Sequence, residues 1–145
     1  MHIIKKLTIL LLIINSLVAK EIIINNLEEK LLTSSGLSYI LKADKKTIDA
    51  KKLKKLNFFN RKKIISNSLY YTNGDFSKKN IKVHFKKGYF LEGDFYMQDC
   101  FSSYNGAYIK SKQAKYKKSY IEFSGVVMKK NDKIYHKFRY RVDTK

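Results

Sequence analysis

The segment IKVHFKKGYFLEGDFYM, residues 81–97, decides the fold class. In its first half, Ile81, Val83 and Phe85 alternate with lysine and histidine, so apolar and polar side chains fall on opposite faces of an extended chain. The alternation pauses at residues 87–88 and then resumes. Strict period two over this length predicts half-buried β-strands. Four residues of the second half are expected to share one face: Tyr89, Leu91, Phe95 and Met97.

The same alternation returns near the C-terminus, where residues 131–133 (Asn-Asp-Lys) predict a hairpin turn between two strands. Four residues of the strand before this turn are expected to share one face: Ile121, Phe123, Gly125 and Val127. The strand after it is expected to place four residues on one face: His136, Phe138, Tyr140 and Val142. The opposite face of that strand would carry Tyr135, Lys137, Arg139 and Arg141.

Upstream segments read as further strands, namely residues 21–24, 37–41 and 62–72, with a short helix allowed at 51–55. No long amphipathic helix is required anywhere. The predicted fold is therefore all-β, with eight to ten short strands. Glycine pairs lie 19 residues apart (Gly74 with Gly93, Gly106 with Gly125), which suggests stacked β rungs that bend at equivalent places.

The N-terminus predicts export. Lys5 and Lys6 precede an apolar stretch, Leu7–Ala19, that is shorter than the roughly 20 apolar residues a membrane-spanning helix needs. Residues 1–19 are therefore expected to be a signal peptide, with an uncleaved anchor as the alternative, and residues 20–145 a single β domain. The expected location is the periplasm, with inner-membrane anchoring if the N-terminal segment is retained.

The chain is strongly basic, with 31 Lys and Arg residues against 12 Asp and Glu and a net charge of +19. Loss of the signal peptide would leave +17, since only Lys5 and Lys6 lie within it. A charge this far from zero points to anionic partners such as nucleic acid, lipid headgroups or an anionic glycolipid. Lysines spread over ordinary solvated surfaces are the alternative explanation.

Residues for catalysis are not arranged in any recognisable pattern. Cys100, the single cysteine, cannot form an internal disulfide, and His84 and His136 are distant and lack metal-ligand spacing. No phosphate-binding glycine loop or nucleophile motif occurs in the sequence. The sequence thus predicts a binding protein that is not an enzyme and needs no metal or cofactor. Its 11 Tyr and 9 Phe supply apolar and half-buried contacts.

Two adjacent segments carry a family resemblance. Residues 109–116 (IKSKQAKY) and 120–128 (YIEFSGVVM) resemble a rung of the OstA-like lipopolysaccharide-export family of periplasmic β-jellyroll proteins, and residues 47–53 resemble a poorer second copy. The resemblance implies an open, twisted β-jellyroll in which lipid acyl chains lie between two sheets. It also implies that copies or partners join edge to edge through the first and last strands.

On this resemblance, the expected function is binding of an anionic glycolipid as part of lipopolysaccharide transport. The chamber would be lined by Val83, Phe85, Leu91, Phe95, Ile121, Phe123 and Phe138. Cations at the rim would be Lys86, Lys87, Lys117 and Lys118. Arg139 and Arg141 would bind phosphate in the forked geometry that lysine lacks, or alternatively protect the sheet edge by charge.

Two other functions remain open from sequence. An exported nucleic-acid-binding module would place its aromatic side chains on an open basic face. An envelope structural or interaction protein would pair with a partner, or with a second copy, through a sheet edge.

Overall fold

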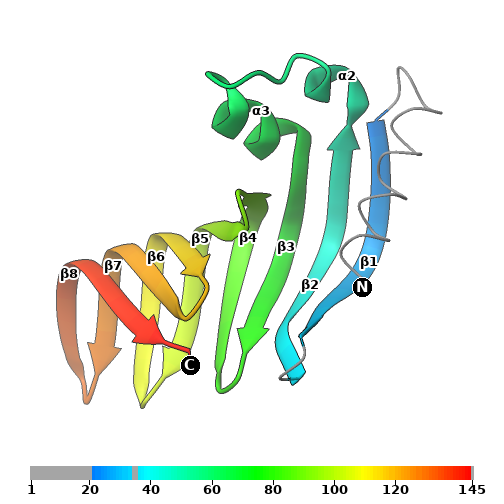
Figure 1. Ribbon diagram of the computed structural model, residues 1–145. Helices are drawn as coiled ribbons and strands as arrows, with labels where there is room; N and C mark the ends of the chain where they lie inside the picture. The colour runs from blue at the N-terminus through cyan, green and yellow to red at the C-terminus, as the bar shows by residue number, and fades with distance from the viewer. Residues whose placement is uncertain (1–20, 34–35, 145) are drawn as a thin grey trace.

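The computed structural model describes residues 21–33 and 36–144. These residues form one antiparallel sheet of eight strands that follow one another in sequence order, so that β1 and β8 are its edges (Figure 1). The predicted all-β class is confirmed, whereas the expected signal peptide lies outside the described residues. The strands are β1 (Glu21–Thr33), β2 (Gly36–Asp49), β3 (Leu69–Lys78), β4 (Ile81–Leu91), β5 (Asp94–Tyr104), β6 (Ala107–Lys117), β7 (Tyr120–Lys130) and β8 (Lys133–Asp143).

Two short helices, α2 (Ala50–Leu53) and α3 (Arg61–Ser68), connect β2 to β3. The Asp49 carboxylate accepts a hydrogen bond from the Lys52 backbone amide at 3.0 Å and caps α2, which fits the short helix expected there. The strand expected over residues 62–72 is wrong for most of its length, because α3 occupies it up to Ser68. Short runs that contain isoleucine fit both the 3.6-residue period of a helix and the two-residue period of a strand, and this run forms a helix.

Each central strand bends near its middle. In β6 the buried residues are Ala107, Ile109 and Ser111 and then Ala114 and Tyr116, so their spacing widens from two to three at the bend. The strands β5 and β7 show the same shift. Register places the bend residues in one row across the sheet, which we call the bend row: Asn26, Asp44, Asn73, Lys86, Asp99, Lys112, Gly125 and Phe138.

Every second strand carries a left-handed residue in the bend row. These residues are Asn26 (φ 52°), Asn73 (φ 51°), Asp99 (φ 53°) and Gly125 (φ 65°), types that adopt this conformation more readily than others. The last three lie 26 residues apart, so the structural repeat is a pair of strands. The 19-residue glycine interval is not this repeat, because it pairs mid-strand glycines with glycines in hairpin turns.

The bend folds the sheet onto itself. The ring of Phe76 on β3 lies 4.7 Å from the ring of Tyr116 on β6, three strands away. In a flat sheet, three strand spacings alone would separate them by about 14 Å. We call the strand portions on the α3 side of the bend row the helix half, and those beyond it the far half. Apolar side chains from both halves meet in an interior between them.

Candidate functional site

The middle of the interior is filled with apolar side chains. Five of the residues expected to line a chamber do point inward and are fully buried: Val83, Phe85, Phe95, Ile121 and Phe123. Phe76 stacks on Phe95 with ring centroids 5.4 Å apart and planes inclined by 19°. These residues form a packed core at the centre, so a hydrocarbon tail finds no empty chamber there.

Two residues expected in the chamber lie outside it, which corrects the prediction. Leu91 pairs with Asp94 beside the inward pair Phe90 and Phe95, so Leu91 faces outward and is half-buried. Phe138 stands in the bend row and is 81% exposed. The bend shifts the phase of the alternation, so residues two apart along one strand change faces when the bend lies between them.

The inner face of β8 differs from the expected one for the same reason. Tyr135 and Lys137 pair with the buried residues Met128 and Val126 and therefore face inward before the bend. After the bend, Tyr140 and Val142 face inward opposite Phe123 and Ile121. The expected grouping of Phe138 with Tyr140 is wrong. The outward placement of Arg139 and Arg141 is confirmed.

A polar network closes the interior at the β1 end. The Glu29 carboxylate accepts hydrogen bonds from Lys46 Nζ at 2.9 Å and from the Tyr71 hydroxyl at 2.7 Å. The side chains of Glu29 and Lys46 are each only 17% exposed. Burial, followed by the Glu29 charge, raises the pKa of Tyr71 and raises that of Tyr39 to about 12. These groups hold the first three strands together through charge and hydrogen bonds.

The β8 end of the interior is open by comparison. Lys137 Nζ lies 5.4 Å from the centroid of the Tyr140 ring, which in turn lies 6.4 Å from the Phe123 ring. Tyr135 is 43% exposed, although it faces inward. In the described chain β8 is the last strand, so these side chains are the outermost cover of the apolar interior on this side. We call this region the β8 mouth.

The predicted rim cations are not brought into one cluster. Lys86 stands exposed in the bend row, whereas Lys117 and Lys118 lie where β6 turns into β7. Arg139 and Arg141 lie on the outer face of β8. The guanidinium of Arg139 is 5.6 Å from the Phe138 ring, and that of Arg141 is 3.7 Å from the Tyr120 ring.

Lys87 is held by its surroundings, unlike the other rim cations. Its Nζ donates a hydrogen bond to Asn67 of α3 at 3.2 Å and lies 4.6 Å from the Tyr70 ring. Burial, and to a lesser degree the charge of Lys52, lowers the pKa of Lys87. This lysine therefore joins α3 to the outer face of the sheet.

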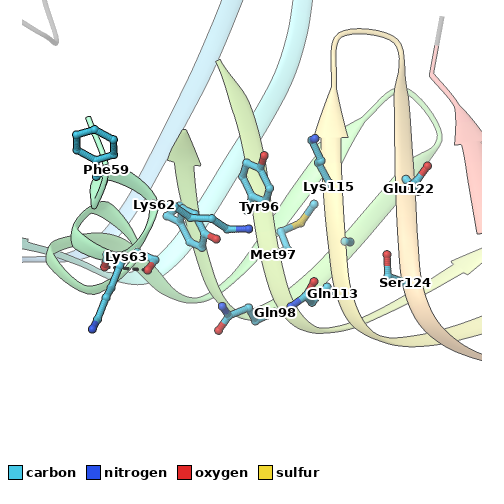
Figure 2. A pocket seen from close by; sticks show the side chains of 13 residues that line it. Phe59, Lys62, Lys63, Tyr96, Met97, Gln98, Gln113, Lys115, Glu122 and Ser124 are labelled. Atoms are coloured by element: carbon cyan, nitrogen blue, oxygen red, sulfur yellow. Dashed lines mark hydrogen bonds between the residues drawn. The ribbon is translucent and has the colours of Figure 1, made fainter. Parts of the chain in front are cut away.

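A cleft of about 520 Å³ lies between α3 and the outer face of the helix half (Figure 2). We call it the α3 cleft. One row of its floor contains the cross-strand neighbours Gln98, Gln113 and Ser124. The next row contains Tyr96, Lys115 and Glu122. The α3 side contributes Phe59, Lys62, Lys63 and Ser66. Sequence reasoning missed this cleft because it assigned the α3 segment to a strand.

Lysine side chains lie around the tyrosine rings of the α3 cleft and give it positive charge. Tyr89 and Tyr96 stack with centroids 5.3 Å apart and planes inclined by 4°. Lys62 Nζ and Lys115 Nζ each lie 5.2 Å from the Tyr96 ring, and Lys115 lies 3.8 Å from an Asp94 carboxylate oxygen. Burial, then the neighbouring Tyr96, raises the pKa of Tyr89.

Metal-binding groups are not gathered in the described part of the chain, although His84, Asp99 and Cys100 line one cavity of about 720 Å³ and His84 Nδ1 lies 2.9 Å from Asp75. No cluster of three or more metal-ligating side chains occurs among residues 21–33 and 36–144. No helix within these ranges is both long and apolar enough to span a bilayer. Cys100 is buried, and this burial raises the pKa of its thiol to about 12, which disfavours the nucleophilic thiolate. In comparisons with known proteins, neither a family model nor a curated protein matches the chain.

Proposed function

We propose that the chain is a cell-envelope protein that binds an anionic glycolipid of the lipopolysaccharide type. The observation that carries this proposal is the β8 mouth, where an apolar interior is covered by two tyrosines and a lysine at the edge of the sheet. Acyl chains would enter there and contact Phe123, Val126 and Met128. The interior supplies apolar contact, and the basic surface of the chain supplies attraction for phosphate.

The filled centre of the interior limits how far a tail would reach. Phe76 and Phe95 are fully buried and stacked, so displacing them would break the core of the fold. Tyr140 is half-buried, and Tyr135 and Lys137 are exposed, so these side chains can move aside at lower cost. A tail would therefore replace the cover of the β8 mouth and leave the central aromatic core in place.

The bent sheet further supports an open jellyroll of the lipopolysaccharide-export type. The two segments that resemble this family fall on β6 and β7, joined by a short turn at Lys118 and Ser119. The poorer copy at residues 47–53 crosses from β2 into α2 and does not form an equivalent rung. In this proposal, the segment 1–19 directs export to the periplasm and is cleaved or retained as an anchor.

Four buried phenylalanine rings favour lipid over nucleic acid as the ligand, although Phe58, Phe59 and Phe138 are exposed. Phe76, Phe85, Phe95 and Phe123 are 0% exposed and lie between the two halves of the sheet. On the outer face of the far half, Phe101 and Tyr108 are exposed, but their rings stack on each other at 6.2 Å. A single-stranded nucleic acid needs free ring faces for successive bases.

Binding of fluorescently labelled lipopolysaccharide to the full chain tests the proposal. Binding should saturate and should persist when salt is raised, because apolar contact is not screened by ions. Tyr140→Ala should change the affinity, whereas Phe138→Ala, two residues away on the outer face, should leave it unchanged. Loss of all binding at moderate salt would show surface attraction alone and would reject the mouth as the binding site.

A second candidate function rests on the free edge of β8. Ile134 (63% exposed) and Phe138 (81% exposed) lie on this edge strand, which pairs on one side only in the described chain. An unpaired strand edge can accept a strand from a partner or from a second copy. Phe138→Pro should abolish such a complex in size-exclusion chromatography while circular dichroism retains the β signal. An unchanged complex would exclude pairing through this edge.

A further inference from the structure

We infer that the α3 cleft is a binding site for a phosphorylated sugar. The cleft lies on the outer face of the sheet, opposite the interior in which we place the lipid tail. The inference about the cleft therefore does not depend on the proposed lipid function. Its volume of about 520 Å³ falls within the range of small-ligand sites, roughly 300–1,000 Å³.

The floor of the cleft belongs to two polar rows that cross the helix half from β4 to β8. The first row is Lys87, Gln98, Gln113, Ser124 and Arg139. The second row is Tyr89, Tyr96, Lys115, Glu122 and Arg141. Direct cross-strand neighbours lie about 4.5–5.5 Å apart, so amide, hydroxyl and charged groups follow one another at close intervals.

Three neutral polar side chains on the floor of the cleft have their hydrogen-bonding groups available to a ligand. Within the described ranges, the side chains of Gln98, Gln113 and Ser124 make no hydrogen bond to the protein, although each has donors and acceptors. Figure 2 shows these side chains projecting from neighbouring strands into the cleft. Two amides and a hydroxyl in line provide the mixed donors and acceptors that match the hydroxyl groups of a sugar.

The charged groups of the cleft select an anion. Lys62 and Lys63 from α3 and Lys115 from β6 surround the floor, against the lining carboxylate of Glu122 and that of Asp94, which lies 3.8 Å from Lys115. Hydrogen bonds between a lysine and a phosphate oxygen are charge-assisted and stronger than neutral ones. A phosphate near these lysines and a sugar ring over the amides would use both kinds of group.

The geometry favours a sugar phosphate over a nucleic acid strand. The ring of Tyr96 is already engaged by Tyr89 and by two lysine ammonium groups. Of the aromatic rings that line the cleft, Phe59 at the rim is the freely exposed one, at 95%. Single-strand binding uses a series of free aromatic platforms, and one ring does not provide that.

The cleft is held in shape before any ligand binds. Arg61 at the start of α3 forms an ion pair with Glu92 in the turn between β4 and β5. Near the end of α3, Asn67 accepts the hydrogen bond from Lys87 of β4. Because contacts to β4 and to the turn after it fix both ends of α3, the cleft loses little conformational freedom on binding, which favours a higher affinity.

The test is a titration of the full chain with glucose 1-phosphate, followed by the side-chain amide signals of Gln98 and Gln113 in nuclear magnetic resonance spectra. We expect saturable shifts of these two signals, and binding at least about tenfold weaker for glucose and for inorganic phosphate. Lys115→Gln and Gln113→Leu should each weaken glucose 1-phosphate binding, by about tenfold for the lysine. The control variant Lys110→Gln removes a lysine from the far half of the same strand and should bind normally.

Three results would overturn the inference. Inorganic phosphate binding as tightly as glucose 1-phosphate would show that no sugar is recognised. An equal loss of affinity in Lys110→Gln would show diffuse attraction to a basic surface. Saturable binding of oligothymidylate at these signals, with none by glucose 1-phosphate, would assign the cleft to nucleic acid. Failure of lipopolysaccharide binding would leave the cleft unaffected, since glucose 1-phosphate carries no acyl chain.

Discussion

The two ends of the interior are built from different chemistry. At the β1 end, Glu29 joins Lys46 and Tyr71 in a network of hydrogen bonds that shields the apolar core. At the β8 mouth, the cover consists of Tyr135, Lys137 and Tyr140, and no hydrogen bond between these side chains occurs in the described chain. Both ends terminate the same sheet, yet only one is closed by groups that depend on each other.

This difference identifies where the molecule can open at low cost. Removing a partner from a buried charged network leaves an unpaired group in a poorly solvated place, which is expensive. Moving an exposed lysine or a half-buried tyrosine exposes some apolar surface and breaks no charged pair. The β8 mouth is therefore the end suited to exchange its own side chains for a ligand or a partner.

The largest expected effect separates the filled centre from the open mouth. Phe76→Ala should lower the free energy of unfolding by about 3–5 kcal/mol, because it leaves a cavity among fully buried rings. Tyr140→Ala should cost clearly less, since its side chain is half-buried. Urea unfolding followed by circular dichroism measures both. Equal losses would mean that the mouth is packed as tightly as the centre.

Alkaline pH should weaken the β1 end. Burial and the Glu29 charge raise the pKa of Tyr39 to about 12 and also raise that of Tyr71, against about 10 in the unfolded chain. The folded state then keeps protons that the unfolded state releases. These tyrosines leave the free energy of unfolding unchanged below about pH 10. Above that pH it falls by about 1.4 kcal/mol per pH unit for each fully shifted tyrosine. Urea unfolding over this range should be less steeply pH-dependent in Tyr71→Phe than in the unchanged protein; identical slopes would contradict the account.

The same substitution at the two ends should have unequal effects. Tyr71→Phe removes the hydroxyl that donates to Glu29 at 2.7 Å and should cost about 1.5–3 kcal/mol, as expected for a hydrogen bond to a charged group. Tyr140→Phe should be close to neutral, because its hydroxyl makes no hydrogen bond in the described chain. Thermal unfolding of the two variants measures the difference, and a reversed order would remove the distinction between the ends.

The smallest effect concerns the bend near the mouth. Gly125 adopts a φ of 65°, the conformation that asparagine adopts at Asn26 and Asn73 in equivalent strands. Gly125→Asn should need only a small shift of the Lys112 side chain, which lies 3.2 Å from an added Cβ, whereas Gly125→Val should cost about 1–2 kcal/mol more, because branched residues are strained there. Denaturant midpoints of the two variants check this. Equal midpoints would show that position 125 does not need the left-handed conformation.

The sequence predicted the class of fold but not its bend. Alternation correctly marked Val83, Phe85, Phe95 and Phe123 as buried, because each of these lies within one straight portion of a strand. It placed Phe138 with Tyr140, since a single intervening residue implies a shared face only when the strand is straight. The left-handed residues Asn73 and Asp99 were the available signal, although asparagine and aspartate also occur in ordinary turns.

The α3 cleft could not be foreseen from the residues that form it. Gln98, Gln113 and Ser124 lie on three different strands and become neighbours only through the register of the sheet. The lysines that face them come from α3, whose isoleucines and tyrosine-rich continuation also fit a strand. The hydrogen-bond network at the β1 end could not be predicted from sequence for the same reason, since Glu29 and Tyr71 are 42 residues apart in sequence.

Photo-crosslinking at the two sides of β8 tests the central claim most directly. A p-benzoylphenylalanine placed at Tyr140 faces the interior, whereas the same residue placed at Phe138 faces solvent two positions away. The account predicts a crosslink to lipopolysaccharide from position 140 and little or none from position 138. A crosslink from position 138 alone, or equal yields from both, would contradict an interior that receives the lipid through the β8 mouth.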